Sequence, residues 1–383
     1  MKLRNRLIAL LCIFAFAAIG FLVFKKWVVQ RPFAIILFVT DNLDPRTMAA
    51  ARLYGGRSEP FEMETMGRTV LLRSISQQSP VADSASAASL VSGGQPVGWN
   101  QTPTSDVSLL LREAKANGRS IGLISSGWVA RSAAAAFVAR GVDARDGAAV
   151  AGQLLGETEP DVLLGGGYED FLPELKEGKR QDARDLMLEA RKAGYTSIRN
   201  TAELEGYPTW QRPKLLGLFS PGAMAYRTNG GSSNYQPSLS TMVRKAIQLL
   251  AYDAEGYVLV VDAGLGREAA YQQKPEAALQ QMLELDEAVR VAQQYSGRKS
   301  VIAVAGLANI GGLALTGKPF PGEQGNAFLT ENRHDVPFLQ WNTEMKSPVL
   351  AGDQLFFLRE WEKPLPGDHW DAGQLHQWLL DQL

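Results

Sequence analysis

Asp83-Ser84-Ala85 places a serine hydroxyl where an alanine-rich helix, Ala85 to Leu90, is predicted to begin. The first backbone N–H groups of a helix have no partner within it, and the helix dipole is positive there. Both features favour an alkoxide or a bound phosphate oxygen. The pattern therefore suits a nucleophilic or anion-binding serine. An ordinary helix start has the same residues, and a hydroxyl still needs a base or a metal to lose its proton.

Two aspartates follow strongly apolar runs. Asp41 comes after Ile35 to Thr40, and Asp262 comes after Val258 to Val261. In open parallel sheets the ligand crevice lies beyond the carboxyl ends of the strands, so both carboxylates are candidates for catalysis or metal binding. The other interpretation is a helix cap or a loop residue.

Histidine and cysteine are scarce. The chain has three histidines, His334, His369 and His376, and a single cysteine, Cys12. Zinc sites in hydrolases usually use histidine nitrogen or cysteine sulfur. His369 is predicted in a turn before the last helix and His376 within that helix, so we do not expect either to bind metal. A lone cysteine also excludes an intramolecular disulfide and a cysteine-based metal site.

The elements that would position these side chains are short aliphatic strands alternating with longer helices, which is typical of an α/β fold with a largely parallel sheet. The predicted strands are Phe33 to Thr40, Ser120 to Ser125, Asp161 to Leu164, Tyr257 to Val261, Ser300 to Ala305 and Val336 to Trp341. The predicted helices are Ser105 to Asn117, Gln181 to Ala193, Ser238 to Tyr252, Pro275 to Tyr295 and Trp370 to Leu383. Ser105 or Asp106 is expected to cap the first of these helices. Loops are predicted at 229–234 and 318–325, and one domain covers residues 31–383.

The overall composition favours a globular protein without a nucleic-acid partner. Hydrophobic residues make up 45% of the 383 residues, enough for a large core. Lys+Arg 39 against Asp+Glu 40 gives a formal net charge of -1. A near-neutral chain offers no general attraction for nucleic acid. Any anion-binding site must therefore be local.

The N-terminus has the pattern of a membrane segment. Lys2, Arg4 and Arg6 precede the uncharged run Leu7 to Phe24. As a helix this run would span about 27 Å, close to the ~30 Å of bilayer hydrocarbon, whereas a cleavable signal needs only ~7–15 apolar residues. We predict that residues 1–30 form a signal anchor in a bacterial inner membrane, with the main domain periplasmic. Cleavage after Ala15-Phe16-Ala17 is the alternative.

Six segments, in order, resemble the alkaline phosphatase family. The segments are Phe38 to Asp44 (Asp-Gly-x-Gly in the family), Ala49 to Tyr54, Val81 to Ala88 around Ser84, Asp161 to Gly167, Leu215 to Phe219, and Pro237 to Met242. The resemblance covers nearly all of the chain after residue 30. It implies an alkaline phosphatase-like α/β fold, with a largely parallel central sheet and helices on both faces.

The resemblance also implies roles for three residues. Asp41 stands where an aspartate bridges the magnesium and one zinc, Ser84 where the phosphorylated serine sits, and Asp262 where a glutamate binds magnesium. The family's other ligand positions carry different residues. They hold Arg267 and Tyr271 in place of a zinc-binding aspartate and histidine, Ala133 in place of a threonine, Glu331 near His334 in place of a histidine, and neither Asp nor His in Val304 to Leu307. The phosphate-binding arginine falls on Ala144, with Arg145 one residue away.

These differences imply a divergent member that lacks most metal ligands. At most one divalent metal, Mg or Zn, is expected at Asp41 and Asp262, and Arg267 is expected to neutralise one of these carboxylates. Arg145 and Arg267 are the candidate phosphate-binding residues. The predicted function is a membrane-anchored pseudophosphatase that binds phosphate, a phosphorylated ligand or a protein partner, and a homodimer fits the family. The alternatives are an active phosphomonoesterase or phosphodiesterase with Ser84 as nucleophile, and a structural scaffold.

Overall fold

A computed structural model describes residues 10–18, 20, 33–210, 212–227, 235–310, 313–315, 339–341, 349–350, 352–359 and 367–383. The chain divides into two compact units, Met1–Arg31 and Pro32–Leu383. His334, the predicted loops at 229–234 and 318–325, and the first three residues of the strand predicted at Val336 to Trp341 lie outside the described residues.

The first unit contributes a short helix. Residues 10–18 and residue 20 are helical, and their apolar side chains are exposed. In the parts of the chain that the structure describes, no helix combines the length and the apolar composition needed to cross a membrane.

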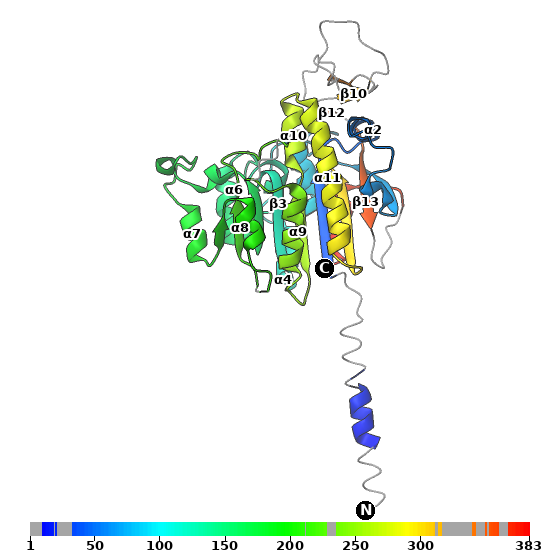
Figure 1. Ribbon diagram of the computed structural model, residues 1–383, viewed down its shortest axis with the longest axis vertical. Coiled ribbons are helices and arrows are strands. Elements are labelled where there is room, and N and C mark those ends of the chain that lie inside the picture. The colour runs from blue at the N-terminus through cyan, green and yellow to red at the C-terminus, as the bar shows by residue number, and fades with distance from the viewer. Residues whose placement is uncertain are drawn as a thin grey trace, which may run out of the picture. The chain divides into compact units, whose positions relative to one another are not determined.

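A ten-stranded sheet forms the centre of the second unit (Figure 1). In spatial order its strands are β14 (His369–Asp371), β2 (Arg68–Arg73), β13 (Gln354–Arg359), β8 (Ser300–Gly306), β1 (Ala34–Thr40), β7 (Tyr257–Asp262), β3 (Ser120–Trp128), β4 (Val162–Gly166), β6 (Leu215–Leu218) and β5 (Thr196–Ile198). The seven strands from β8 to β5 are parallel, and β13 runs antiparallel to both β8 and β2. The predicted α/β fold with a largely parallel sheet is thereby confirmed.

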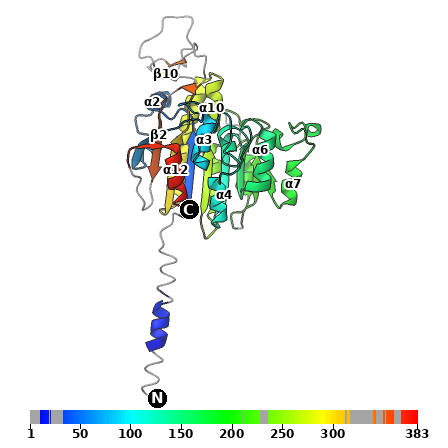
Figure 2. The same cartoon turned by 180° about the vertical axis from the view of Figure 1, so that it is seen from behind.

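Helices cover both faces of this sheet. Figure 1 shows α2 (Pro45–Tyr54), α9 (Leu239–Leu250), α10 (Gly264–Tyr271) and α11 (Pro275–Tyr295) in front of it, and Figure 2 shows α3 (Ser84–Gly93), α4 (Leu110–Ala116) and α12 (Ala372–Leu380) on the opposite face. Alternate side chains of β1 point to opposite faces of the sheet. Ile35, Leu37 and Val39 pack in one core cluster, and Ile36 and Phe38 pack in the other. Both faces of β1 are therefore buried, which explains its uninterrupted apolar sequence.

Shorter elements complete the fold. They are α5 (Ser132–Ala136), α6 (Gly147–Gln153), α7 (Leu186–Lys192), α8 (Thr201–Gly206), the 3-10 turns η1 (Glu62–Thr65), η3 (Tyr168–Phe171) and η4 (Glu174–Lys176), the π-helical turn η2 (Leu154–Thr158), and the two-stranded pairs β9 (Asn309–Ile310) with β12 (Val349–Leu350) and β10 (Leu313–Leu315) with β11 (Leu339–Trp341).

Two helices begin later than predicted. Neither Ser105 nor Asp106 caps α4, because Thr104 accepts a hydrogen bond from the Val107 N–H in a separate turn and the helix starts only at Leu110. The helix predicted from Gln181 begins at Leu186, where Asp185 caps it. In both cases, hydrogen bonds within the preceding loop set the residue at which the helix begins.

The C-terminal helix is also shorter than predicted. His369–Asp371 forms the edge strand β14, and α12 starts at Ala372. The Asp371 side chain accepts a hydrogen bond from the Gln374 N–H, while the Gln374 side chain accepts one from the Asp371 N–H. This reciprocal capping box fixes the helix start two residues beyond Trp370.

Candidate functional site

The register of the central strands brings the predicted carboxylates together at the carboxyl edge of the sheet. Asp262, the last residue of β7, lies opposite Val39 of β1 on one side and Ser125 of β3 on the other. Asp41 follows the end of β1 by one residue. Asp41 and Asp262 are both buried, with 5% and 0% of their surface exposed. Two residues 221 positions apart in sequence therefore share one small volume.

Ser84 reaches the same volume from α3, which begins at Ser84 itself. Asp83 holds the start of this helix: its carboxylate accepts hydrogen bonds from the backbone N–H of Ser86 at 2.9 Å and of Asn100 at 2.8 Å, and from the Ser86 hydroxyl at 2.6 Å. The Ser84 hydroxyl donates to Asp41 Oδ1 at 2.8 Å. The serine is buried, and its proton points at a carboxylate.

Arg267 links the two carboxylates. Its Nη1 lies 3.0 Å from Asp41 Oδ2 and its Nη2 lies 3.4 Å from Asp262 Oδ2. The Arg267 side chain is 2% exposed and both carboxylates are fully buried. The sequence predicted that Arg267 neutralises one of the two carboxylates. The structure places its guanidinium against both Asp41 and Asp262.

Gly264, the first residue of α10, leaves room for this contact. A Cβ atom on Gly264 would lie 2.5 Å from Arg267 Nη2 and 2.7 Å from Asp262 Oδ2, which is closer than Cβ contacts allow. The Ser126 hydroxyl accepts a hydrogen bond from the Leu265 N–H at 3.1 Å and anchors the first turn of α10 to β3. The sequence reading missed Gly264, although a glycine two residues after a strand-end carboxylate is a usable signal.

Ser125 is a second residue that the sequence reading missed. Its hydroxyl donates to Asp262 Oδ2 at 2.8 Å and accepts from the Gly127 N–H at 3.1 Å. Two atoms of the cluster, Asp262 Oδ1 and Arg267 Nε, are buried without a hydrogen-bond partner among the described residues. A polar residue at the carboxyl end of a central strand was the only available signal for Ser125.

Burial and neighbouring charges shift the pKa values of Asp41 and Arg267 in opposite directions. Burial raises the pKa of Asp41 to about 6, although Arg267 and the Ser84 hydroxyl both lower it. Burial by itself would lower the pKa of Arg267, but the charges of Asp262 and Asp41 outweigh it and raise that pKa. The guanidinium therefore stays charged, and with both carboxylates ionised the three residues carry a net charge of about −1.

Arg145 and Tyr271 lie at the outer side of the site. The Arg145 side chain is 70% exposed and its Nη2 lies 2.6 Å from Asp143 Oδ2, so the structure does not bring it against Ser84. The negative charge of Asp83 still acts on it. Tyr271 is half-exposed, and partial burial followed by the charge of Asp41 raises the pKa of its hydroxyl to about 12. Tyr271 is therefore a neutral hydrogen-bond donor.

A sequence profile of the alkaline phosphatase family matches residues 34–339. The chain belongs to the alkaline phosphatase family. It is 27% identical over 323 residues to the tissue-nonspecific alkaline phosphatase of Gallus gallus, covering 70% of this chain and 62% of that one. It is 30% identical over 173 residues to alkaline phosphatase H of Pseudomonas aeruginosa, covering 39% and 36%.

Solved alkaline phosphatases share the fold. The enzyme from the Antarctic bacterium TAB5 superposes with a TM-score of 0.75 at 16% identity, covering 92% of this chain and 98% of that one. The enzyme from Thermus thermophilus gives a TM-score of 0.68 at 27% identity, covering 75% and 62%. The chain spans about three-fifths of the length of the tissue-nonspecific relatives that it matches.

Among the described residues, those around Ser84 do not fit the metal set of an alkaline phosphatase. In the described part of the chain, no group of three or more His, Cys, Asp or Glu side chains could hold a metal ion. The Arg267 guanidinium lies where an ion shared by Asp41 and Asp262 would have to sit. His376 is buried with its Nδ1 3.0 Å from the Val91 carbonyl oxygen, and His369 is exposed on β14.

One departure from the family pattern has a simple backbone explanation. Asn42 stands where the family's Asp-Gly-x-Gly segment has its first glycine, and its φ is 59°. Asparagine adopts this left-handed conformation more readily than most residues, so the turn after Asp41 is kept. The Asn42 N–H also donates to the Ala308 carbonyl oxygen at 2.8 Å, which ties the turn to the segment that follows β8.

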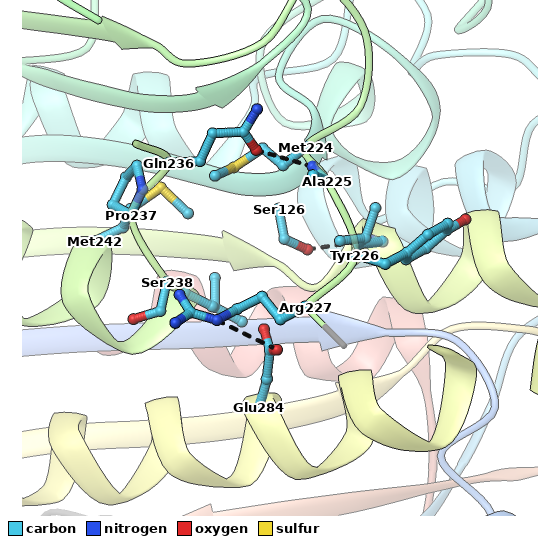
Figure 3. A pocket seen from close by; sticks show the side chains of 12 residues that line it. Ser126, Met224, Ala225, Tyr226, Arg227, Gln236, Pro237, Ser238, Met242 and Glu284 are labelled. Atoms are coloured by element: carbon cyan, nitrogen blue, oxygen red, sulfur yellow. Dashed lines mark hydrogen bonds and ion pairs between the residues drawn. The ribbon is translucent and has the colours of Figure 1, made fainter. Parts of the chain in front are cut away.

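A pocket distinct from the Ser84 cluster lies between the start of α9, the loop at 224–227 and α11 (Figure 3). Its walls are largely apolar, with Met224, Met242 and Leu265 among them. On one side Arg227 Nε faces Glu284 Oε1 across 3.9 Å, as the dashed line in Figure 3 marks. Glu284 Oε1 has no hydrogen-bond partner among the described residues.

Glu284 makes the stability of the protein depend on pH. Burial raises its pKa from 4.5 to about 7, against the lowering effect of Arg227. Because the folded-state pKa lies above the unfolded value, the protein loses stability as pH rises from about 4.5 to about 7. We expect Glu284→Gln to remove this loss, raising the free energy of unfolding by about 2 kcal/mol at pH 8 and by little at pH 4.5.

Urea denaturation at the two pH values measures this difference. Glu287→Gln on the same helix is the matched control, because Glu287 is exposed and pairs with Arg290. An equal effect of Glu284→Gln at both pH values would contradict the prediction.

Proposed function

We propose that this chain is a pseudophosphatase, an alkaline phosphatase family protein whose site at Ser84 binds phosphate or a phosphorylated ligand without hydrolysing it. The observation that supports the proposal is the Arg267 guanidinium, 3.0 Å from Asp41 and 3.4 Å from Asp262. A resident side chain thus occupies the position between the two carboxylates that remain in the site.

The chemistry of phosphate ester hydrolysis explains why an arginine in place of a metal ion matters. Phosphate monoester hydrolysis is so slow without a catalyst that enzymes accelerate it by up to ~10²¹-fold, and bound metals contribute by activating the nucleophile and stabilising the leaving oxygen. A guanidinium can neutralise charge, but it offers no open coordination position for a hydroxyl. In this site its charge is also taken up by two carboxylates, so little of it is left for a substrate.

An oxyanion would therefore depend on other groups. Asp83 takes the Ser86 N–H, so the N–H groups of Ser84 and Ala85 are the ones at the start of α3 that remain for an oxyanion, with the Ser84 hydroxyl beside them. Arg145 is a candidate counter-charge, and its exposed side chain needs to leave Asp143 to approach an anion at Ser84. The net negative charge of the Asp41–Arg267–Asp262 cluster opposes the anion, so we expect weak binding.

Metal analysis and turnover test the proposal. We expect the purified full-length protein to hold less than stoichiometric zinc and magnesium. We also expect its hydrolysis of p-nitrophenyl phosphate with added Zn²⁺ and Mg²⁺ to stay at the background rate, orders of magnitude below a metal-dependent phosphatase. Ser84→Ala should leave that rate unchanged. Stoichiometric zinc together with turnover that Ser84→Ala abolishes would refute the pseudophosphatase.

Phosphate binding distinguishes a ligand site at Ser84 from a function carried by the protein surface. We expect inorganic phosphate at millimolar concentration to raise the melting temperature of the parent protein, and Arg145→Ala to reduce that increase. Arg184→Ala, which removes an exposed arginine paired with Glu189, is the matched control. No stabilisation of the parent by phosphate would point instead to a protein partner, a homodimer or a scaffold.

The alternative is an active phosphomonoesterase or phosphodiesterase with Ser84 as nucleophile. The observation in its favour is the hydrogen bond from the Ser84 hydroxyl to Asp41 Oδ1, because a carboxylate in that position can accept the proton of an attacking serine. The turnover experiment decides between the two functions.

We further propose that the protein is exported and held in the inner membrane by residues 1–30. The support is the uncharged run Leu7 to Phe24 with basic residues on both sides. Membrane fractionation of the full chain beside a chain starting at Pro32 tests this. Recovery of the full chain in the soluble fraction would contradict the anchor.

A further inference from the structure

We propose that the pocket between the start of α9, the loop at 224–227 and α11 binds a free α-amino acid with a short aliphatic side chain. In this complex Glu284 accepts hydrogen bonds from the ammonium group of the ligand, and Arg227 binds its carboxylate. Neither Ser84 nor Arg267 lines the pocket. The proposal therefore stands whether or not the site at Ser84 binds phosphate.

Glu284 presents a buried hydrogen-bond acceptor that the protein does not use. Its side chain is 15% exposed, and its Oε1 has no hydrogen-bond partner among the described residues. Burial raises the pKa of Glu284 to about 7, so the carboxylate is largely ionised at pH 8 although it is poorly hydrated. An ammonium group supplies both the missing donor and a counter-charge.

Arg227 provides the opposite charge at the same pocket. Its Nε lies 3.9 Å from Glu284 Oε1, which is longer than a hydrogen bond, and its side chain is 37% exposed. A guanidinium binds a carboxylate through two parallel hydrogen bonds. The more buried Glu284 and the more exposed Arg227 therefore orient the ligand with its ammonium group inward and its carboxylate toward solvent.

The two charges together select a zwitterion. A ligand with only a positive charge is repelled by Arg227, and a ligand with only a negative charge is repelled by Glu284. The ammonium and carboxylate groups of an α-amino acid are attached to the same carbon atom, so its charges are also a few ångströms apart. Such a ligand meets an opposite charge at each end.

The walls of the pocket suit an aliphatic side chain. Met224, Leu239, Met242 and Leu265 line it, and each is at most 7% exposed. Figure 3 shows Met224 on the side of the pocket away from Glu284. Thioether side chains adapt to the shape of an apolar group. The pocket has about 390 Å³ of empty space, part of it open to solvent, which limits the ligand to a small molecule.

Three other polar side chains of the pocket are hydrogen-bonded to the backbone. The Ser126 hydroxyl accepts from the Leu265 N–H, Gln236 Oε1 accepts from the Ala225 N–H, and the Ser238 hydroxyl accepts from the N–H of residue 241. These bonds hold the shape of the pocket. Recognition of a charged ligand therefore depends on Glu284 and Arg227.

Glu284 lowers the stability of the folded protein once it is ionised, because its folded-state pKa lies above the unfolded value. Glutamine has nearly the same shape and avoids this loss. A buried carboxylate that destabilises the fold and lines a pocket is typical of a binding site, where function and stability often conflict.

Isothermal titration calorimetry of the full-length protein at pH 8 tests the proposal with L-alanine, L-valine and L-leucine. We expect binding at one site per chain. L-Valinamide lacks the carboxylate charge and N-acetyl-L-valine lacks the ammonium group, so each should bind at least about tenfold more weakly than L-valine. No binding of any of the three amino acids at about 10 mM would overturn the proposal. Equal affinity for L-valine and either derivative would also overturn it.

Two variants test the assigned residues. Glu284→Gln should bind L-valine at least about tenfold more weakly, and unfolding is not the cause because this variant is expected to be more stable at pH 8. Arg227→Gln should weaken binding of L-valine and leave that of L-valinamide nearly unchanged. Glu287→Gln, on the exposed side of α11, is the matched control and should bind as the parent does. Unchanged L-valine binding in Glu284→Gln would contradict the assignment.

The phosphate experiment remains independent of this one. Glu284→Gln should leave the effect of phosphate on the melting temperature unchanged, because Glu284 belongs to a different pocket from Ser84. Loss of amino-acid binding with an intact phosphate response supports the proposal. Loss of both in Glu284→Gln would show a general defect and overturn the assignment of Glu284 as a ligand-binding residue.

Discussion

Replacing Arg267 by alanine in a buffer that contains EDTA is expected to lower the free energy of unfolding by about 3–5 kcal/mol. The guanidinium is the only cation in contact with Asp41 and Asp262 among the described residues, and all three side chains are buried. Its loss leaves two carboxylates close together without a counter-charge. Urea denaturation at pH 7.5, followed by circular dichroism, measures the effect.

Two comparison variants show whether the unpaired buried charge causes the loss of stability in Arg267→Ala. Arg290→Ala removes an arginine from the exposed pair with Glu287, and we expect a change within about 0.5 kcal/mol. Arg267→Met combined with Asp41→Asn and Asp262→Asn removes both the cation and the charges, and should recover most of the lost stability. An Arg267→Ala chain as stable as the parent would mean that the carboxylates need no counter-charge.

Replacing Asp83 by alanine is expected to cost about 3 kcal/mol of stability and to loosen Ser84. The Asp83 side chain is buried, caps α3 through the Ser86 N–H, and holds the Asn100 N–H of a neighbouring loop. Alanine leaves these donors unsatisfied in the interior, which costs more than the loss of a cap on the surface. The free energy of unfolding from urea titration and hydrogen exchange of the α3 amides measure the two effects.

The exposed cap of α6 is the matched control for this prediction. Asp146 accepts from the Ala149 N–H at 3.0 Å but lies on the surface. We expect Asp146→Ala to cost about 1 kcal/mol. Asp83→Asn keeps an acceptor for the Ser86 N–H and should cost less than Asp83→Ala. Equal losses in Asp83→Ala and Asp146→Ala would show that burial of the Asp83 carboxylate adds nothing.

Local patterns were sufficient to predict five strands of the parallel sheet, β8, β1, β7, β3 and β4, but not the two parallel strands β6 and β5. Runs such as Ile35 to Val39 are apolar at every position because helices cover both faces, and that pattern needs no knowledge of the rest of the chain. The edge at β2, β13 and β14 was not predicted. Its pairing joins segments nearly 300 residues apart, and β2 alternates buried with exposed side chains, so no local run marks it.

The positions of the two candidate arginines could not be predicted from local sequence either. Arg267 and Arg145 looked equivalent in the sequence as possible partners of a phosphate. The structure buries Arg267 between two carboxylates and leaves Arg145 exposed beside Asp143. Their difference depends on Gly264, which makes room for one guanidinium, and on a surface turn at 143–145 that captures the other.

The sequence by itself determined that a serine stands where an alanine-rich helix begins and that Asp41 and Asp262 lie at the carboxyl ends of strands, because apolar runs and helix-start residues act over a few positions. Only the tertiary structure decided how these groups are used. Strand register placed Asp262 beside Ser125 and near Asp41, and α10 turned Arg267 back onto both carboxylates. The electrostatic state of the site depends on distances of about 3 Å between residues far apart in the chain, and local sequence contains no measure of those distances.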